Sequence, residues 1–329
     1  MEPAESPMPR PQVVDLCTVT PAELEALWQH EAQWWREQLR WDIADNVAAL
    51  RRVLARRGVS GKAVRVGPET VGYAYYGLVD GLAMIAGPVL ALEWSSAAVG
   101  EPLLQATLDA VRQQGVWRIE SQCVATDGHW RCPAFEHAGF RTYWREFLRL
   151  ELSPVPELSI NPASLVHLEP WQGGSLPAAA VSMQAAYEGS VDAQINVRYR
   201  TVDGCRAVLV QLLNQGGCGL FVAAASAIAY HKGQGIGFII VTESAPLQGH
   251  LAQVVVRPDY QRQGVGRLLV SYSLAQLTAL RFATLSLIVS RANAGALRLY
   301  QAMGWQPVLA FPAFAWERSG DDRGQASPA

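Results

Sequence analysis

The chain has 329 residues, of which 50% are hydrophobic and 17% are charged, and its formal net charge is −2. This length predicts two domains, and this composition excludes a chain that is disordered throughout. No basic excess is available for nucleic-acid phosphates, no apolar run approaches the roughly 18 residues of a membrane span, and the five cysteines are scattered. We therefore expect a soluble cytoplasmic protein that binds neither nucleic acid nor membrane.

Apolar strands alternate with helical patterns along the chain, which predicts a mixed α/β sheet. The first half is expected to hold one helix that ends before Gly58 and another from Leu103 to Gln114. In the second half the expected elements are, in chain order, the helices Leu176–Tyr187 and about Cys205–Asn214, the strands Leu220–Ala225, Gly237–Thr242 and His250–Val256, the helix Gly266–Arg281, the strand Leu285–Val289 and the helix Ala294–Met303.

The two halves share a pattern in which an apolar strand, a polar loop and a short helix end in glycine and an aromatic residue. Gly139 and Gly304 stand 165 positions apart, and so do Gly72 and Gly237. Stacking repeats have periods of about 20–50 residues, so an offset of this size indicates two tandem domains. We interpret the chain as a duplicated α/β domain.

The prolines between the halves set the expected domain boundary. Pro154, Pro156 and Pro162 break any helix or central strand there, so we place the boundary near residue 157. The polar ends are expected to be disordered. The predicted division is a disordered start over 1–12, a first domain over 13–156, a second domain over 157–317 and a disordered end over 318–329.

A glycine loop follows the β-branched strand that ends at Val256. Gly264 and Gly266 have no Cβ, so successive backbone N–H groups can turn toward one point at a helix N-terminus, where unpaired donors and the dipole favour a diphosphate. Arg262 and Arg267 add positive charge. A tight strand-to-helix turn would use the same glycines without a ligand, so the two glycines alone leave both interpretations open.

The older phosphate motifs fit this loop poorly. A Walker loop needs lysine where Arg267 stands, and a Rossmann fingerprint needs a third glycine where Leu269 stands. The full Q-x-x-G-x-G that begins at Gln261 resembles the acetyl-coenzyme A motif of the GNAT N-acetyltransferase superfamily. The block from Asn293 to Trp305 is similar to the N-x-x-A-x-x-x-Y-x-x-x-G-[FW] element that follows one strand later in that superfamily.

The resemblance implies two tandem GNAT-like domains, of which the second is an acetyl-CoA-dependent N-acetyltransferase. An acetyl group would pass to a primary amine by direct attack, without a metal, and the acceptor would be a small molecule or a peptide or protein amine. The oligomeric state stays open. The residues that the resemblance assigns to acetyl-CoA are Val254, Val255, Val256, Gln261, Arg262, Gln263, Gly264, Val265, Gly266, Arg267 and Asn293. The alternative function is a non-catalytic acyl-CoA sensor or scaffold, in which the loop persists without turnover.

Amine acetylation needs a group that takes a proton from the amine and a group that protonates or stabilises the leaving thiolate. Tyr300 matches the tyrosine that acts as general acid in many GNAT enzymes, and the other interpretation is a core aromatic. The glutamate that some relatives place on the fifth strand is Ile288 here. The position at the start of the fourth strand is His250, which is the expected base or else a hairpin residue, and Glu243 competes with it.

Asp192 and Asn196 lie in the region that lines the acceptor side in GNAT enzymes. A similar D-x-x-x-N pattern occurs at Asp42 and Asn46 in the first half, so a structural helix-cap role is equally open.

The first half has lost every key residue of the second. At the offset of 165, Val99 and Glu101 replace the two loop glycines, Gly128 replaces Asn293 and Phe135 replaces Tyr300. A glutamate repels a diphosphate, and phenylalanine has no proton to give. We therefore expect the first half to bind no acetyl-CoA.

Overall fold

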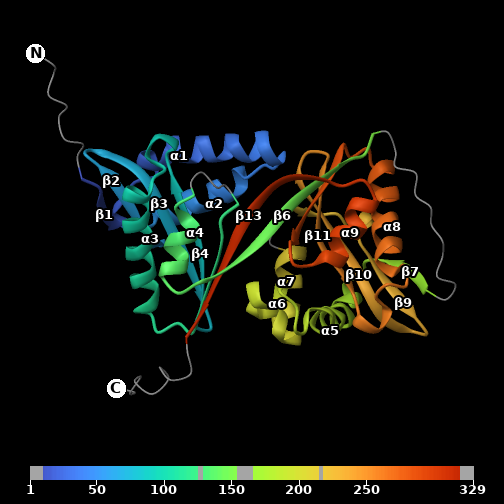
Figure 1. The fold of residues 1–329 in the computed structure, drawn as a ribbon. Coiled ribbons are helices and arrows are strands. Elements are labelled where there is room, and N and C mark those ends of the chain that lie inside the picture. The colour runs from blue at the N-terminus through green and yellow to red at the C-terminus, as the bar shows by residue number, and fades with distance from the viewer. Residues whose placement is uncertain (1–9, 125–128, 154–165, 215–217, 319–329) are drawn as a thin grey trace, which may run out of the picture. The chain divides into compact units, whose positions relative to one another are not determined.

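The computed structural model describes residues 10–124, 129–153, 166–214 and 218–318, and Figure 1 labels their helices and strands. The chain divides into two compact units. Unit 1 consists of Met1–Glu37, Asp42–Tyr143 and Phe311–Ala329, and unit 2 consists of Gln38–Trp41 and Trp144–Ala310. The expected boundary near residue 157 lies outside the described residues, as do most of the two ends that were expected to be disordered. Gln12 lies inside the first strand, so order begins before the predicted residue 13.

Unit 1 is built on a sheet with the strand order β1-β2-β3-β4-β5-β13, in which only the β4–β5 pair is parallel. The strands are β1 (Gln12–Asp15), β2 (Ser60–Val66), β3 (Glu69–Val79), β4 (Leu82–Leu90), β5 (Arg118–Gln122) and the last part of β13 (Gln306–Glu317). The helices are α1 (Pro21–Trp34), α2 (Ala44–Ala55), α3 (Ala97–Arg112) and α4 (Arg131–His137).

Unit 2 repeats this arrangement with the strand order β6-β12-β11-β10-β9-β7, in which only the β11–β12 pair is parallel and β8 pairs with β10. The strands are β6 (Arg141–Glu151), β7 (Val166–Pro170), β8 (Leu220–Phe221), β9 (Ala227–His231), β10 (Gln234–Ala245), β11 (Gln248–Val256) and β12 (Thr284–Ser290). The helices are α5 (Leu176–Tyr187), α6 (Asp192–Ile195), α7 (Val202–Asn214), α8 (Val265–Ala279) and α9 (Ala294–Ala302). The shared strand order agrees with the duplication inferred from the sequence.

The helix starts follow from local sequence. Thr20 and Glu23 form a capping box at the start of α1, where the Thr20 backbone N–H donates to Glu23 Oε2 at 2.8 Å and Pro21 occupies the first turn. In unit 2, α5 also has a proline in its first turn, and α8 begins directly after Gly264. No helix in the described part of the chain is long and apolar enough to cross a membrane.

Each unit's sheet is completed by a strand from the other half of the sequence. Strand β6 follows α4 in the chain, yet it pairs with β12 of unit 2 from Arg145↔Ser290 to Glu151↔Thr284. Strand β13 follows α9, yet its end pairs with β5 of unit 1 from Ala313↔Gln122 to Glu317↔Arg118. The compact units therefore differ from the contiguous domains 13–156 and 157–317, because local patterns do not report which distant edge a strand pairs with.

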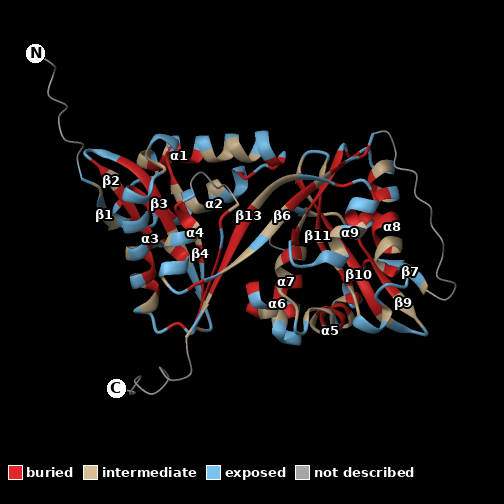
Figure 2. Cartoon of the chain, viewed as in Figure 1, coloured by how far each residue is buried: buried red, intermediate tan, exposed pale blue. Residues whose placement is uncertain are grey.

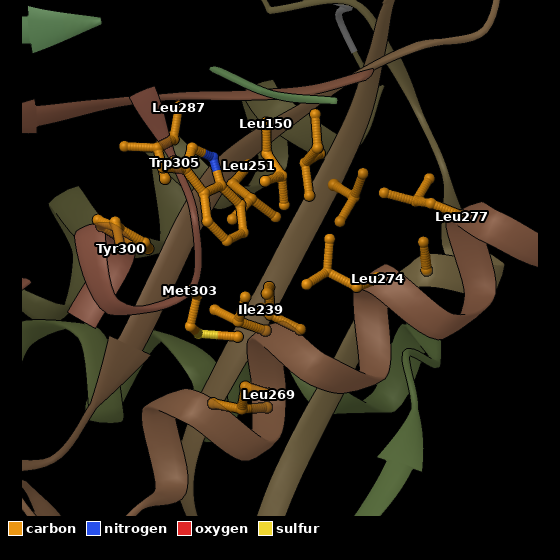
Figure 3. Packing of buried hydrophobic residues seen from close by; sticks show 14 of the residues in the cluster. Leu150, Ile239, Leu251, Leu269, Leu274, Leu277, Leu287, Tyr300, Met303 and Trp305 are labelled. Atoms are coloured by element: carbon orange, nitrogen blue, oxygen red, sulfur yellow. The ribbon is translucent and has the colours of Figure 1, made fainter. Parts of the chain in front are cut away.

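The sheet of unit 2 has an apolar core on each face. One face carries Leu251 and Leu287 and packs on α8 and α9, with Leu150 of β6 in the same cluster as Trp305 (Figure 3). The other face carries Phe238 and packs on α5 and α7. In Figure 2 the central strands β10 and β11 show much red, as expected where a sheet is covered on both faces, whereas β6 is mainly tan and blue.

Most of the predicted second-half elements are present, with one correction. Helix α5 has the predicted bounds, and α8, α9, β11 and β12 agree with the prediction to within two residues at each end. The predicted strand Leu220–Ala225 is wrong beyond Phe221, because the alanines 223–225 form a 3-10 turn. After this turn, the Val241 N–H donates to the Ser226 hydroxyl at 2.9 Å. In a continuous strand, a backbone carbonyl would accept this hydrogen bond. Strand β9, which begins after this turn, was not predicted.

Candidate functional site

The glycine loop of unit 2 connects β11 to α8 in the predicted order. Gly264 has φ +85°, a left-handed conformation that favours glycine, and it stands at the N-cap of α8. The Leu268 N–H is bonded to the Gly264 carbonyl, so the N–H groups of the preceding turn point out of the helix start. A Cβ on Gly266 would meet nothing closer than Leu299 Cδ2 at 3.5 Å. This helix start is therefore open to an anion.

Two glutamines hold the loop in place. Gln261 Nε2 donates to the Val256 carbonyl at 3.0 Å, and Gln263 Nε2 donates to the Asp259 carbonyl at 2.8 Å. Both side chains therefore serve the shape of the loop, which is a physical reason for glutamine in the motif.

A cavity of about 610 Å³ lies over this loop. The predicted acetyl-CoA residues that line it are Val254, Val256, Gln261, Arg262, Gly264, Gly266, Arg267 and Asn293. Three others do not line it, because Val255 and Val265 belong to the two apolar cores and Gln263 turns back to Asp259. The alternation of a strand explains why Val255 faces away from its neighbours.

Strands β11 and β12 separate beside the cavity. Pairing between β11 and β12 runs only from Gln248↔Thr284 to Leu251↔Leu287, although β11 continues to Val256 and β12 to Ser290. The β11 backbone from Ala252 onward therefore has no strand partner on its β12 side within the described residues. Such an exposed strand edge offers N–H and C=O groups to an extended ligand arm.

Tyr300 on α9 lines the 610 Å³ cavity and also a smaller one of about 110 Å³. Its side chain is buried, and its hydroxyl forms no hydrogen bond with any residue that the structure describes. Burial, and then the negative charge of Asp192, raise the pKa of Tyr300 well above its ordinary value. Tyr300 is therefore a neutral phenol with a proton free to donate into the cavities.

The smaller cavity adjoins the larger one at Asp192, Val254, Asn293, Ala296 and Tyr300, which line both. It extends between the ends of β11 and β12 toward α5. Its remaining lining is formed by Arg145, Tyr187, Tyr199, Leu251, Ala252, Gln253, Leu287, Ile288, Val289 and Ser290. The two cavities together reach from the glycine loop to a polar pocket on the α5–α7 side of the sheet.

The predicted acceptor residues separate in the structure. Asp192 is buried, accepts a hydrogen bond from Ser290 Oγ at 2.7 Å and lines both cavities. Asn196 lines neither, and its side chain caps the following 3-10 turn by accepting the Arg198 N–H at 3.2 Å. Asn293 combines both roles, since it lines both cavities and caps α9 by accepting the Ala296 N–H at 3.1 Å.

The expected base, His250, does not line either cavity. It is 4% exposed, its ring lies 4.7 Å from that of Trp41 and 6.3 Å from that of Phe147, and its Nδ1 is 3.0 Å from Ser286 Oγ. Burial, and then the charge of Arg145, lower the pKa of His250 to about 3. A ring so enclosed and so weakly basic does not support a general-base role.

Glu243, the competing base, is also absent from both cavity linings. Its Oε1 accepts the Leu247 N–H at 2.8 Å and so closes the turn between β10 and β11. The sequence placed both candidates correctly beside the strands but could not show which way they face.

The burial of His250 predicts a pH dependence of stability. Its folded pKa of about 3 is lower than the ordinary value near 6.5, so the unfolded chain binds the proton more readily. The neutral His250 ring therefore contributes fully to the stability of the folded state above pH 6.5, and this contribution is lost as the pH falls toward 3. Between pH 7 and pH 5 the free energy of unfolding of the wild type should fall by about 2 kcal/mol more than that of His250→Phe, as measured by urea unfolding.

The exposed His167 provides the control for this measurement. Its side chain is 58% exposed, and His167→Gln should follow the wild-type pH profile. Equal losses in the wild type and His250→Phe would contradict the buried neutral state of His250.

Unit 1 has a different surface at the place that matches the glycine loop. A cavity of about 450 Å³ lies at the start of α3, and its lining includes Glu101, Pro102 and His137. Phe135, at the position of Tyr300, is fully buried and its ring stacks on that of Phe314 at 3.9 Å. Gly128, at the position of Asn293, lies outside the described residues.

A family model described as the acetyltransferase (GNAT) family matches residues 200–305, which include β10, the glycine loop and Tyr300. The match is confined to the second half of the chain. The GNAT match ends at residue 305, directly before β13, and it also leaves out β6, so it contains neither of the two strands that are exchanged between the halves.

Curated relatives of this GNAT segment are named [ribosomal protein bS18]-alanine N-acetyltransferase. The protein from Escherichia coli K12 is 38% identical over 65 residues, which is 20% of this chain and 44% of the relative. The protein from Salmonella typhimurium is 34% identical over 65 residues, which again is 20% of this chain and 44% of the relative. The chain therefore spans less than half the length of the curated relatives that it matches.

Solved GNAT structures match nearly the whole chain. A GCN5-related N-acetyltransferase from Sphaerobacter thermophilus gives a TM-score of 0.65 at 16% identity and covers 94% of this chain and 97% of its own. A tandem GNAT protein from the clavulanic acid biosynthesis pathway gives a TM-score of 0.57 at 15% identity, and the match covers 94% of this chain and 98% of that protein's chain. At these identities the likeness establishes the fold, and it confirms two tandem GNAT-like domains.

Arg145 and Tyr187 line the smaller cavity and Trp41 encloses His250, and the sequence alone indicated none of these three roles. Arg145 lies on β6 and Trp41 in the segment Gln38–Trp41, both from the half of the sequence without the motifs. The sequence of β6 does not distinguish Arg145 from Arg141 and Arg149, and the pairing of β6 with β12 places Arg145 in this pocket.

Proposed function

We propose that unit 2 transfers an acetyl group from acetyl-CoA to a primary amine by direct attack. The observation that supports this most strongly is that the cavity over the glycine loop and the smaller polar pocket have Asp192 and Tyr300 in common in their linings. A bound thioester supplies an activated acetyl group, and an amine in the polar pocket would meet it between them.

The residues present fit acetyl-CoA. The open start of α8, with Arg262 and Arg267, suits the diphosphate, and the unpaired β11 edge beside Val254 suits the pantetheine amides. A backbone N–H of that edge stabilises negative charge on the thioester oxygen. Asn293 lies at the start of α9 along the same cavity.

The acid–base roles follow from the cavity linings. Tyr300 donates its phenolic hydrogen to the departing sulfur, and its raised pKa keeps it protonated across the working pH range. Asp192 is the carboxylate that lines both cavities in the described part of the chain, and it attracts the acceptor's ammonium group. The amine proton then leaves through water, because His250 is enclosed.

Calorimetry and thiol release test this proposal on the intact chain. One acetyl-CoA per chain is expected to bind, because Glu101 and Phe135 replace the loop glycine and the phenol in unit 1. Release of CoA thiol is then measured against a panel of amines and peptides. A stoichiometry of two would show that unit 1 also binds, and tight binding without any turnover would favour the acyl-CoA sensor instead.

A further inference from the structure

Arg145 carries a positive charge on the wall of the smaller cavity. Its partner in the β6–β12 pair is Ser290, and its side chain is 15% exposed. Its Nη2 lies 3.6 Å from Asp192 Oδ1, which is an ion pair but longer than a hydrogen bond. That same Asp192 oxygen already accepts the Ser290 hydroxyl at 2.7 Å.

The guanidinium donors of Arg145 make no hydrogen bond with any residue that the structure describes. Its Nε is buried without a partner. A guanidinium carries five N–H donors in a planar fork, and leaving the buried Nε–H of Arg145 unused is costly. This pattern is typical of a group whose partner is a ligand.

Apart from Asp192 and Tyr300, the other polar side chains that line this cavity are neutral and already hydrogen-bonded. Tyr187 Oη donates to Gln253 Oε1 at 2.8 Å, Gln253 Nε2 donates to Tyr199 Oη at 3.0 Å, and the two tyrosine rings stack at 4.5 Å. Burial raises the pKa of both phenols, so they stay uncharged. Arg145 and Asp192 are thus the two charges that the described lining presents to a ligand.

We propose that Arg145 binds a carboxylate on the acceptor, so that the substrates are small amines with a carboxylate a few bonds from the nitrogen, such as free amino acids. This assignment rests on the proposed acetyltransferase function. The planar fork of arginine matches a carboxylate through two parallel N–H···O bonds. Asp192, 3.6 Å from the fork, faces the ammonium of the same molecule.

The size of the cavity agrees with such a ligand. A volume of about 110 Å³ corresponds to roughly four water molecules at about 30 Å³ each, which suits an amine and a carboxylate held close together. The N-terminus of a peptide is followed by a neutral amide, so it would leave the guanidinium unpaired. Peptide acceptors are therefore the alternative that the experiment must exclude.

Matched acids and amides test the proposal on the intact protein. Glycine, β-alanine and 4-aminobutyrate are each compared with their carboxamides, by calorimetric titration in the presence of saturating CoA and by initial rates with acetyl-CoA. The wild type should bind each preferred acid about 10-fold to 100-fold more tightly than its amide, as expected for hydrogen bonds to charged groups. An alanine tetrapeptide amide should bind no better than the carboxamides.

The variants separate a carboxylate contact from a structural role. Arg145→Gln should remove the preference for acids while the weak binding of amides stays, and Arg145→Lys should retain only part of it. Arg149→Gln is the matched control, because Arg149 lies on the same face of β6 but donates to the Gln38 carbonyl at 3.2 Å and lines neither cavity. Unchanged acetyl-CoA affinity shows that each variant is folded.

The two proposals fail in different ways. Equal wild-type affinity for acids and amides, tighter binding of the tetrapeptide, or an equal loss for acid and amide in Arg145→Gln would overturn the carboxylate assignment, even if acetyl transfer occurs. If Arg145→Gln does not fold, Arg145→Lys provides the test. If this lysine variant prefers acids over amides as strongly as the wild type does, the planar guanidinium does not bind the carboxylate. Acid-selective binding without CoA release would sustain the pocket assignment and refute the transferase.

Discussion

Replacing Tyr300 with phenylalanine is expected to lower kcat by about 100-fold or more while changing the KM for acetyl-CoA by less than about threefold. The ring packs beside Trp305, with 5.5 Å between the ring centroids, and phenylalanine preserves that packing (Figure 3). The substitution removes only the hydroxyl, which has no hydrogen-bond partner among the described residues. The loss should therefore appear in the step where the thiolate departs, measured as steady-state thiol release.

Tyr272 supplies the control for this substitution. It lies on α8, its hydroxyl donates to the Ala224 carbonyl at 3.3 Å, and it lines neither cavity. Tyr272→Phe should keep nearly the wild-type kcat. If Tyr300→Phe also keeps it when chemistry limits the rate, Tyr300 is a packing residue and thiolate departure needs no side-chain acid.

The local geometry of the glycine loop could be predicted because its residues are close together in sequence. The loop from Gln261 to Arg267 joins one strand to one helix, and its glycines and glutamines act within that turn. Asn293 and Tyr300 are likewise fixed by a single short helix. Local conformation determines these positions, so the sequence pattern was sufficient.

The acceptor side could not be predicted, because distant segments build it. Whether His250 is open or enclosed depends on Trp41 and Phe147, which come more than 100 positions earlier in the chain. The charge of Arg145 reaches the pocket only through the pairing of β6 with β12. Strand pairing of this kind is set by the complementarity of two edges and by burial, which periodicity along one strand does not reveal.

The exchange of β6 and β13 also gives a physical reason for retaining both halves, although the first lacks the loop glycines and the tyrosine of the second. Leu148 and Leu150 of β6 belong to the core of unit 2, and Phe314 of β13 belongs to the core of unit 1. Each unit therefore depends on the other half of the sequence for part of its core. The first half contributes Arg145 to the smaller cavity and Trp41 to the packing around His250, without a glycine loop of its own.

Placing a carboxylate in the glycine loop should abolish useful acetyl-CoA binding. Gly266→Glu copies the residue that unit 1 has at the matching position, Glu101, and is expected to weaken the affinity by about 100-fold or more. A like charge a few ångströms from the diphosphate costs about 1–4 kcal/mol, and the side chain also occupies the cavity that the helix start faces. The measurement is calorimetric titration with acetyl-CoA.

Gly266→Gln separates the charge from the bulk, because it has nearly the same size and no charge. The affinity of Gly266→Gln for acetyl-CoA should be about 10-fold or more higher than that of Gly266→Glu. This difference in affinity should decrease as the salt concentration is raised, because ions screen the repulsion between exposed charges. A Cβ at this position meets only ordinary contacts, at 3.5 Å to Leu299 and 3.8 Å to Val256, so both variants should fold. If Gly266→Glu binds acetyl-CoA as tightly as the wild type, the diphosphate lies elsewhere and the start of α8 is only a tight turn.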